Sequence, residues 1–354
     1  MAVTAYRFEL EMIESLVDLR TRLYGDSPET ALHAEEIRRL LSQSFSFHAD
    51  PGNDHMCFIA RLGNTPVGHV TATVNGQLKT PGGDPVGAIG FFECIDDYSV
   101  ATQLLDAAVD WLKNDNALTR IWGPIQFDIW HGYRFKTRGF NVNRFTGEPI
   151  NKSYYPHFLE RYGFKPKYQW SSVWIAEPEA VENLISHRAP KLNYLMGKDL
   201  RFATLSGHED LRVLHGAIMK AFLPLLGSTP LPFEEFERLF LARCRDDRLV
   251  TIVKDPDDRV LAFALAYPNK QTCGTSSLSN EEAVFFLVGT TEPSGIRNKM
   301  LAPSTVYHAV RECFHAGYSS VVLALMRKSI WLEAIRIKHL DDALSTYALF
   351  ELEI

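Results

Sequence analysis

The chain has 354 residues, which predicts two domains, and 46% of them are hydrophobic, which is enough for sizeable cores. Its 37 basic and 43 acidic residues give a formal net charge of −6, which argues against general nucleic-acid binding by a basic surface. No run of about 18 apolar residues occurs, so no membrane span is expected, and the N-terminal residues lack the apolar core of a secretory signal. The cysteines are widely spaced and form no CxxC pair, which predicts a cytoplasmic protein with reduced, buried thiols.

The first half of the chain is predicted to mix strands and helices, because its apolar residues recur with a period of 2 in some segments and of 3.6 in others. The strands expected are residues 4–12, 55–62, 67–74, 86–95, 119–124 and 168–175. The helices expected are residues 11–23, 35–42, a helix capped by Ser99, and residues 155–162. Residues 177–199 are predicted to form a linker with one helix near 181–187.

The second half repeats this order. The strands expected are residues 201–207, 248–254, 260–267, 283–292, 319–326 and 345–354, and the helices are residues 210–222, 233–243, 304–316 and 329–337. A repeat of about 170 residues is too long for a solenoid unit and indicates two copies of one domain. We therefore expect an N-terminal domain over residues 1–178, a linker over 179–199 and a C-terminal domain over 200–354.

Residues 121–164 form a segment dense in aromatic side chains, arginine and asparagine. Loops run over the surface and are normally polar, so a loop of this composition must fold back on something. One interpretation is a compact loop packed on its own side chains. The interpretation we favour is a wall of a binding pocket, because aromatic walls with a few polar groups are typical of ligand sites.

The order of elements, with Gly163-Phe164 after the last helix of the first half, resembles the GNAT acyltransferase fold in tandem over the whole chain. The segment GPIQFDIWHGYRF and the later YYPHFLERYGFKP are similar to a bacterial group of GNAT-related proteins with GP-x-N-x-S, GF-x-x-P-P and YYP-x6-GF patterns. The resemblance implies an α/β fold with two GNAT-like domains, each a mixed, mostly antiparallel sheet flanked by helices.

The resemblance also implies a cofactor loop in which coenzyme A pyrophosphate lies on backbone N–H groups at a helix N-terminus. In the first half, Asp96, Asp97 and Ser99 occupy this stretch, and the two carboxylates would repel a pyrophosphate. In the second half the matching stretch has basic residues, although Met300 replaces a family glycine. The predicted cofactor-binding residues are Val288, Gly289, Thr290, Arg297, Asn298, Lys299, Leu301 and Ala302.

Family members often use a tyrosine on the last helix to protonate the leaving thiolate, but Leu159 stands at that position in the first half. The predicted catalytic residues are instead Glu93, in the apolar strand FFECI, His131 and Tyr155. Glu93 is either exposed or a general base, and His131 is either structural or a group that titrates near neutral pH. The predicted substrate-binding residues are Asp128, Trp130, Tyr133, Arg134 and Tyr154.

The function predicted is that of an N-acyltransferase that moves an acyl group from acetyl-CoA or another acyl-CoA to the amine of a small molecule. One alternative is an enzyme of the same fold that takes its acyl group from an acyl carrier protein or an aminoacyl-tRNA. The net acidity argues against tRNA, because binding phosphates needs clustered basic residues. Another alternative is a non-catalytic ligand-binding protein. No metal-ligand spacing occurs, so no metal is expected.

Overall fold

The computed structural model describes most of the chain, and the description below is confined to those residues. They are residues 1–175, 200–205, 208–223, 225, 228–241, 249–270, 282–291, 296–327 and 344–354. The predicted linker and the predicted helices over 181–187 and 329–337 lie outside them. The domain boundary near residue 178 therefore stays a prediction.

The N-terminal half contains the strands and helices in the predicted order. The strands are β1 (Ala2–Tyr6), β2 (Asp54–Leu62), β3 (Thr65–Lys79), β4 (Pro85–Cys94), β5 (Arg120–Gly123), β6 (Ile125–Gln126), β7 (Asp128–Tyr133), β8 (Phe135–Arg138) and β9 (Lys165–Ile175). The helices are α1 (Leu10–Tyr24), α2 (Pro28–Leu40), α3 (Tyr98–Asp110) and α4 (Tyr155–Tyr162). Helix α2 begins where Ser27 accepts a hydrogen bond from the Thr30 N–H and Pro28 takes the first helical position.

The C-terminal half repeats the pattern. Its strands are β10 (Arg201–Thr204), β11 (Leu249–Lys254), β12 (Val260–Pro268), β13 (Glu282–Thr290), β14 (Ser320–Arg327) and β15 (Leu344–Glu353). Its helices are α7 (His208–Phe222), α8 (Phe233–Phe236), which continues as a helical turn over Glu237–Leu241, and α9 (Ile296–His315).

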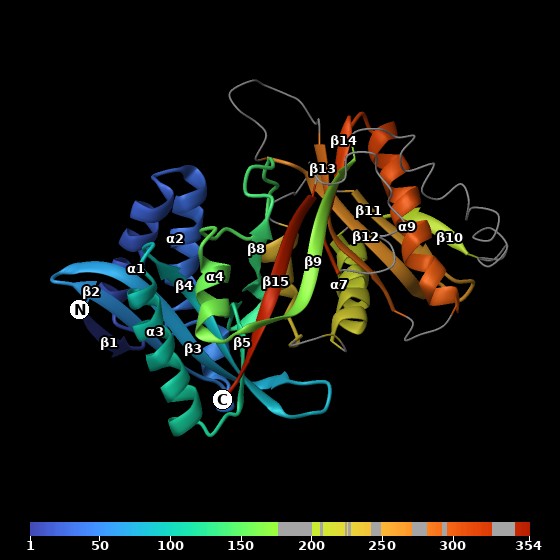
Figure 1. The fold of residues 1–354 in the computed structure, drawn as a ribbon. Helices are drawn as coiled ribbons and strands as arrows, with labels where there is room; N and C mark the ends of the chain where they lie inside the picture. Colours follow the sequence, from blue (N-terminus) through green and yellow to red (C-terminus); the bar gives the residue numbers. More distant parts are fainter. Residues whose placement is uncertain are drawn as a thin grey trace.

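The two halves share one sheet, whose strands run in the order β1-β2-β3-β4-β5-β15-β9-β14-β13-β12-β11-β10. The last strand of the chain, β15, lies between β5 and β9 of the N-terminal half, and β9 in turn pairs with β14 of the C-terminal half. Figure 1 shows β15 and β9 side by side at the centre of the molecule. Each half thus supplies one of the two strands that join them.

Helices cover both faces of this sheet. In the N-terminal half, α3 and α4 pack on one face, and α1 and α2 pack on the other. In the C-terminal half, α9 covers one face, and α7 and α8 cover the other. A central core joins the halves, because Trp122 of β5, Trp170 of β9, Val322 of β14 and Tyr347 of β15 belong to one buried cluster.

The fold class predicted from sequence is confirmed, since the described strands form a mixed sheet in which only the β4–β5 and β13–β14 pairs are parallel. Two local expectations are wrong. The aromatic segment was expected to be a loop, but it contains β6, β7 and β8, and β8 pairs with β15. The helix expected over residues 304–316 begins at Ile296, so that Pro303 lies inside it. In the aromatic segment, turn residues obscured the strand signals. In the helix that begins at Ile296, Pro303 obscured the helical signal.

Replacing Phe350 with alanine tests the shared strand. The Phe350 side chain is fully buried in the core of the N-terminal half, although it belongs to the last strand of the chain. We expect the free energy of unfolding to fall by about 3–5 kcal/mol, the usual cost of emptying a phenylalanine site. Urea denaturation measures it, with Glu353→Ala on the same strand as the control. A loss under about 1 kcal/mol would contradict the central position of β15.

Candidate functional site

In the N-terminal half, the parallel strands β4 and β5 move apart, and the chain that follows β5 fills the gap between them. Strand β4 pairs with β5 only at Gly87 and Ala88, and the strands then diverge. The Ile125 carbonyl oxygen lies so close to Gly90 of β4 that a side-chain Cβ there would stand 2.1 Å from it. The far end of β4 is buried, with Cys94 fully inaccessible. The segment after β5 therefore occupies the space that a ligand would need.

The helix that follows β4 is also closed to an anion. The Asp97 carboxylate caps α3 by accepting hydrogen bonds from the Ser99 backbone N–H at 2.8 Å and from the Ser99 hydroxyl at 2.7 Å. A carboxylate at this end uses the N–H group and the favourable dipole that would attract a pyrophosphate. Both features agree with the expectation that the first half lacks the usual cofactor loop.

In the C-terminal half, the corresponding parallel strands β13 and β14 also pair over only part of their length. Strand β13 pairs with β14 only over Glu282–Phe285 and then continues to Thr290. Beyond Phe285, every residue of β13 except Leu287 is partly exposed, including the predicted cofactor residues Val288, Gly289 and Thr290. This exposure contrasts with the buried end of β4.

Helix α9 starts six residues after β13, at Ile296. Arg297, Asn298 and Lys299 lie in its first turn, where backbone N–H groups have no partner within the helix. Leu301 is 1% exposed and packs with Val253, Leu261 and Ala262. Its side chain therefore belongs to the core, which does not favour the predicted contact with a cofactor. Ala302 lies one residue further on, past the first turn.

Glu93 and Tyr155, two of the predicted catalytic residues, do meet. The Tyr155 hydroxyl donates to a Glu93 carboxylate oxygen at 2.8 Å, and the Tyr24 hydroxyl donates to the same oxygen at 3.1 Å. Arg20 forms a hydrogen-bonded ion pair with the other oxygen. All of Glu93 except 4% is buried, so strand alternation does not expose it. Burial raises the pKa of Tyr155 well above its ordinary value.

The structure does not bring this pair to the predicted cofactor residues. Between β4, which carries Glu93, and β13, which carries Val288, the sheet order places β5, β15, β9 and β14. Five inter-strand steps of about 4.8 Å put the two strands roughly 24 Å apart. A general base must lie within hydrogen-bond reach of the proton it takes, so Glu93 and Tyr155 cannot serve an acyl group held at β13.

The β6–β7 hairpin carries the predicted substrate residues from the N-terminal half into the C-terminal half. The Trp130 indole N–H donates to the Thr229 carbonyl at 2.8 Å, and its ring packs near Phe222 and Phe240. Trp130 is therefore part of the C-terminal core. Tyr133 lies in the central aromatic cluster with Phe286, the first residue of β13 beyond its pairing with β14.

Tyr154 stays in the N-terminal half. Its hydroxyl donates to the Cys94 carbonyl at 2.8 Å, so it belongs with Glu93 and Tyr155 rather than with the hairpin. The predicted substrate residues thus separate into two groups, and only the hairpin residues reach the C-terminal half.

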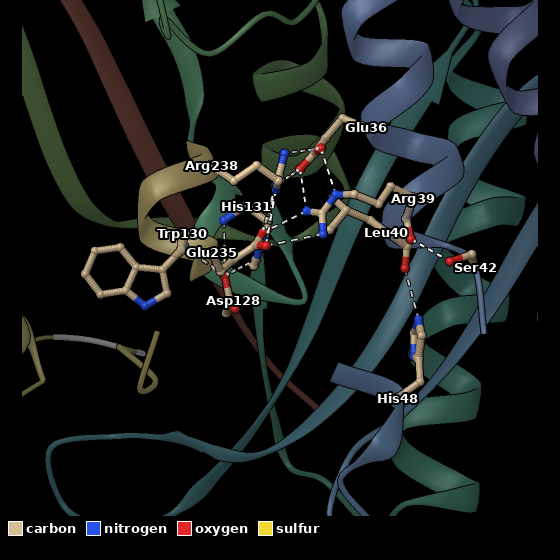
Figure 2. A network of polar contacts seen from close by, with 10 residues as sticks. All are labelled: Glu36, Arg39, Leu40, Ser42, His48, Asp128, Trp130, His131, Glu235 and Arg238. Carbon is tan, nitrogen blue, oxygen red and sulfur yellow. Dashed lines mark hydrogen bonds and ion pairs between the residues drawn. The ribbon is translucent and has the colours of Figure 1, made fainter. Parts of the chain in front are cut away.

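His131 lies where the two halves meet (Figure 2). Its Nδ1 is 2.8 Å from an Asp128 carboxylate oxygen and its Nε2 is 2.8 Å from a Glu235 carboxylate oxygen. Its side chain is only 2% exposed. Both ring nitrogens are therefore engaged by carboxylates, which favours a structural role for His131 over the predicted catalytic one.

A network of ion pairs extends from this histidine to helix α2. Glu235 accepts hydrogen bonds from Arg39 at 2.9 Å and from Arg238 at 2.7 Å. Glu36 of α2 accepts from the same two arginines, each at 2.9 Å. Four charged side chains from α2 and the α8 region thus join the halves through alternating charges.

Burial alone would lower the pKa of His131, but Asp128 and Glu235 raise it to about 9. The pKa of Glu235 is raised by burial and lowered by more through His131 and Arg238, so it lies below its ordinary value. His131 is therefore a buried cation at neutral pH.

Sequence reasoning missed both partners that define these sites. Arg20 follows Ile13, Leu16 and Val17 at helical spacing, so its place on the buried face of α1 was visible in the apolar pattern. Glu235 gave no such signal, because its contact with His131 depends on how the two halves pack.

Comparison with known proteins identifies the fold. The model of the Acetyltransferase (GNAT) family matches residues 13–127. A solved tandem GNAT protein from the clavulanic acid biosynthesis pathway has 10% identity and a TM-score of 0.50, over 99% of this chain and 98% of that one. A GCN5-related N-acetyltransferase from Anabaena variabilis ATCC 29413 has 8% identity and a TM-score of 0.56, over 99% and 72%. A probable N-acyltransferase from Enterococcus faecalis V583 has 11% identity and a TM-score of 0.54, over 100% and 73%. A search of curated proteins finds no match.

These likenesses confirm the resemblance seen in the sequence. Residues 13–127 match the model of the GNAT family, and the chain as a whole has the fold of a tandem GNAT protein. The enzyme class that this family and fold support is N-acyltransferase. Among the described residues, no helix has both the length and the apolarity needed to cross a bilayer, and no cluster of side chains is suited to hold a metal ion.

The stabilisation that His131 provides should depend on pH. Because the folded-state pKa is raised from 6.5 to about 9, it is fully present below pH 6.5 and is lost as the pH rises through 9. The free energy of unfolding of the wild type relative to His131→Gln should fall by roughly 2–3 kcal/mol between pH 6 and pH 10. Denaturation at several pH values measures this difference, with the exposed His157→Gln as the control. A pH-independent difference would show that His131 is not held as a cation.

Replacing Glu93 with glutamine should mainly destabilise the protein, because it leaves the buried Arg20 charge without its counterion. Breaking such a pair costs about 3–5 kcal/mol. Thermal and urea unfolding measure the loss, and Glu160→Gln on the exposed side of α4 is the control. If the variant folds as stably as the wild type but has lost acyl transfer, Glu93 is catalytic and the structural assignment fails.

Proposed function

We propose that the protein is an N-acyltransferase that takes an acyl group from acetyl-CoA or another acyl-CoA and transfers it to the amine of a small molecule. The C-terminal half binds the acyl-CoA, and the β6–β7 hairpin of the N-terminal half contributes to the acceptor site. The observation that carries this proposal is the partly exposed end of β13, beyond its pairing with β14. The corresponding end of β4 is buried.

Three features support the placement of the acyl-CoA in the C-terminal half. The extended arm of the cofactor needs a strand edge, and β13 continues from Phe286 to Gly289 beyond its last residue paired with β14. Backbone N–H groups in the first turn of α9 have no partner within the helix, and the sequence places the basic residues Arg297 and Lys299 in that turn, where a pyrophosphate would bind. In the N-terminal half, Ile125 blocks the strand edge and Asp97 caps the helix.

In the reaction, the neutral amine attacks the thioester carbonyl, a C–N bond forms, and the C–S bond breaks to release the coenzyme A thiol. The proton lost by the amine balances the one that the thiolate gains. Backbone N–H groups of the open part of β13 are the donors placed to stabilise the carbonyl oxygen as it becomes negative. The aromatic side chains of the central cluster exclude water from the acceptor amine and keep it neutral.

Replacing Arg297 with alanine should weaken the binding of acetyl-CoA. A charge-assisted hydrogen bond to phosphate contributes about 1–3 kcal/mol, so the dissociation constant should rise roughly 5-fold to 150-fold. Isothermal titration calorimetry of the purified protein with acetyl-CoA measures the change. Ser99→Ala, at the start of the corresponding helix in the first half, is the matched control and should bind as the wild type does.

Two results would overturn the proposal. If Ser99→Ala weakens binding and Arg297→Ala does not, the acyl-CoA occupies the N-terminal half. If the wild type binds neither acetyl-CoA nor longer acyl-CoA thioesters, the donor is not a free coenzyme A ester. Transfer from an acylated carrier protein would then point to the other donor class.

A further inference from the structure

Arg134 is a buried cation with no counterion among the described residues. Its Nε and Nη1 atoms are inaccessible to solvent and have no hydrogen-bond partner. Arg20, which is also buried, differs because it forms an ion pair with Glu93. An unpaired charge of this kind is costly to bury, so its retention calls for an explanation.

Aromatic rings hold the guanidinium of Arg134 in place. Its Cζ lies 3.8 Å from the centre of the Tyr133 ring and 4.5 Å from the centre of the Trp170 ring. The rings attract the positive charge, and the Tyr133 side chain also forms a hydrogen bond with Arg134, but Nε and Nη1 remain without a partner. Burial lowers the pKa of Arg134.

The backbone at Arg134 is also unusual. Its φ angle is +69°, in the left-handed region that side chains other than glycine seldom adopt. The Arg134 N–H donates to the Pro124 carbonyl at 3.1 Å, which fixes this conformation at the end of the hairpin. Strained residues of this kind are common at ligand sites.

Arg134 lies near the strands of the proposed acyl-transfer site, because its guanidinium lies over Trp170 of β9, and Trp170 pairs with Arg327 of β14. Tyr133, which carries the guanidinium on its ring, belongs to the same cluster as Phe286 at the open end of β13 and Leu325 of β14. Arg134 as a whole residue keeps some exposure, although its Nε and Nη1 atoms are inaccessible to solvent. The single positive charge of Arg134, which lies among aromatic rings, is suited to bind a ligand group with one negative charge.

We propose that Arg134 binds the carboxylate of the acceptor, and that the acceptor is therefore an amine that carries a carboxylate, such as an amino acid. Guanidinium N–H groups donate to carboxylate oxygens, and the Nε and Nη1 groups of Arg134 have no hydrogen-bond partner here. The rings of Tyr133 and Trp170, which contact the guanidinium of Arg134, would lie beside the bound acceptor. This inference rests on the proposed function for the amine, but the binding of the carboxylate is separable from acyl transfer.

Calorimetry in the absence of acyl-CoA tests the carboxylate site alone. The probes are L-alanine, L-leucine, L-phenylalanine, L-glutamate and L-lysine, each compared with its decarboxylated amine, and inorganic phosphate. We expect at least one amino acid to bind at least tenfold more tightly than its amine. Arg134→Gln should remove that preference, and Arg134→Lys should restore part of it. Arg161→Gln, in which the lost guanidinium lies over Tyr98 on the surface, is the matched control.

The outcomes separate this inference from the proposed function. Binding of an amino acid that depends on Arg134, without release of thiol from acetyl-CoA, supports the carboxylate site and overturns the acyltransferase. Thiol release with decarboxylated amines that is unchanged in Arg134→Gln supports the acyltransferase and overturns the carboxylate site. If none of the amino acids binds the wild type, or phosphate binds better than all of them, the inference is wrong. If Arg134→Gln does not fold, Arg134→Lys carries the same comparison.

Discussion

The pairing of β15 with β5 and β9 is the constraint on which the rest of the structure depends. It places the last strand of the chain inside the sheet of the first half, and it commits β9 to pair with β14 of the second. Backbone hydrogen bonds and the alternating burial of Tyr347 and Phe350 fix the register of β15, since a shift by one residue would exchange its two faces. The two halves therefore cannot be separated without opening both cores.

Because the two halves share the central strands β15 and β9, the gap between the parallel strands differs from one half to the other. In the first half, the chain after β5 turns into the gap beside β4 and then crosses to the second half as the β6–β7 hairpin. The same hairpin thus closes one gap and delivers Tyr133 and Arg134 to the neighbourhood of the other. The His131 network holds the hairpin against helix α2 and the α8 region, so the position of Arg134, three residues after His131, depends on these charges.

The sequence was sufficient to predict the order of elements, because periodic apolar residues and turn residues are local signals. It also indicated that the aromatic segment folds inward, since Phe127 and Trp130 are buried. It could not show that β15 inserts between β5 and β9, because strand order is a non-local property that each strand's own pattern leaves open. For the same reason it grouped Glu93 and Val288 in one site, although roughly 24 Å of sheet separates their strands.

Two buried arginines show why residue type alone could not assign the site. Arg20 and Arg134 both lie among aromatic rings, and burial lowers the pKa of both. Arg20 has a carboxylate partner, so its charge is compensated within the protein and contributes to the fold. Arg134 has no carboxylate partner in the described part of the chain. An unpartnered cation in this position is the reason for proposing that Arg134 binds the carboxylate of the acceptor.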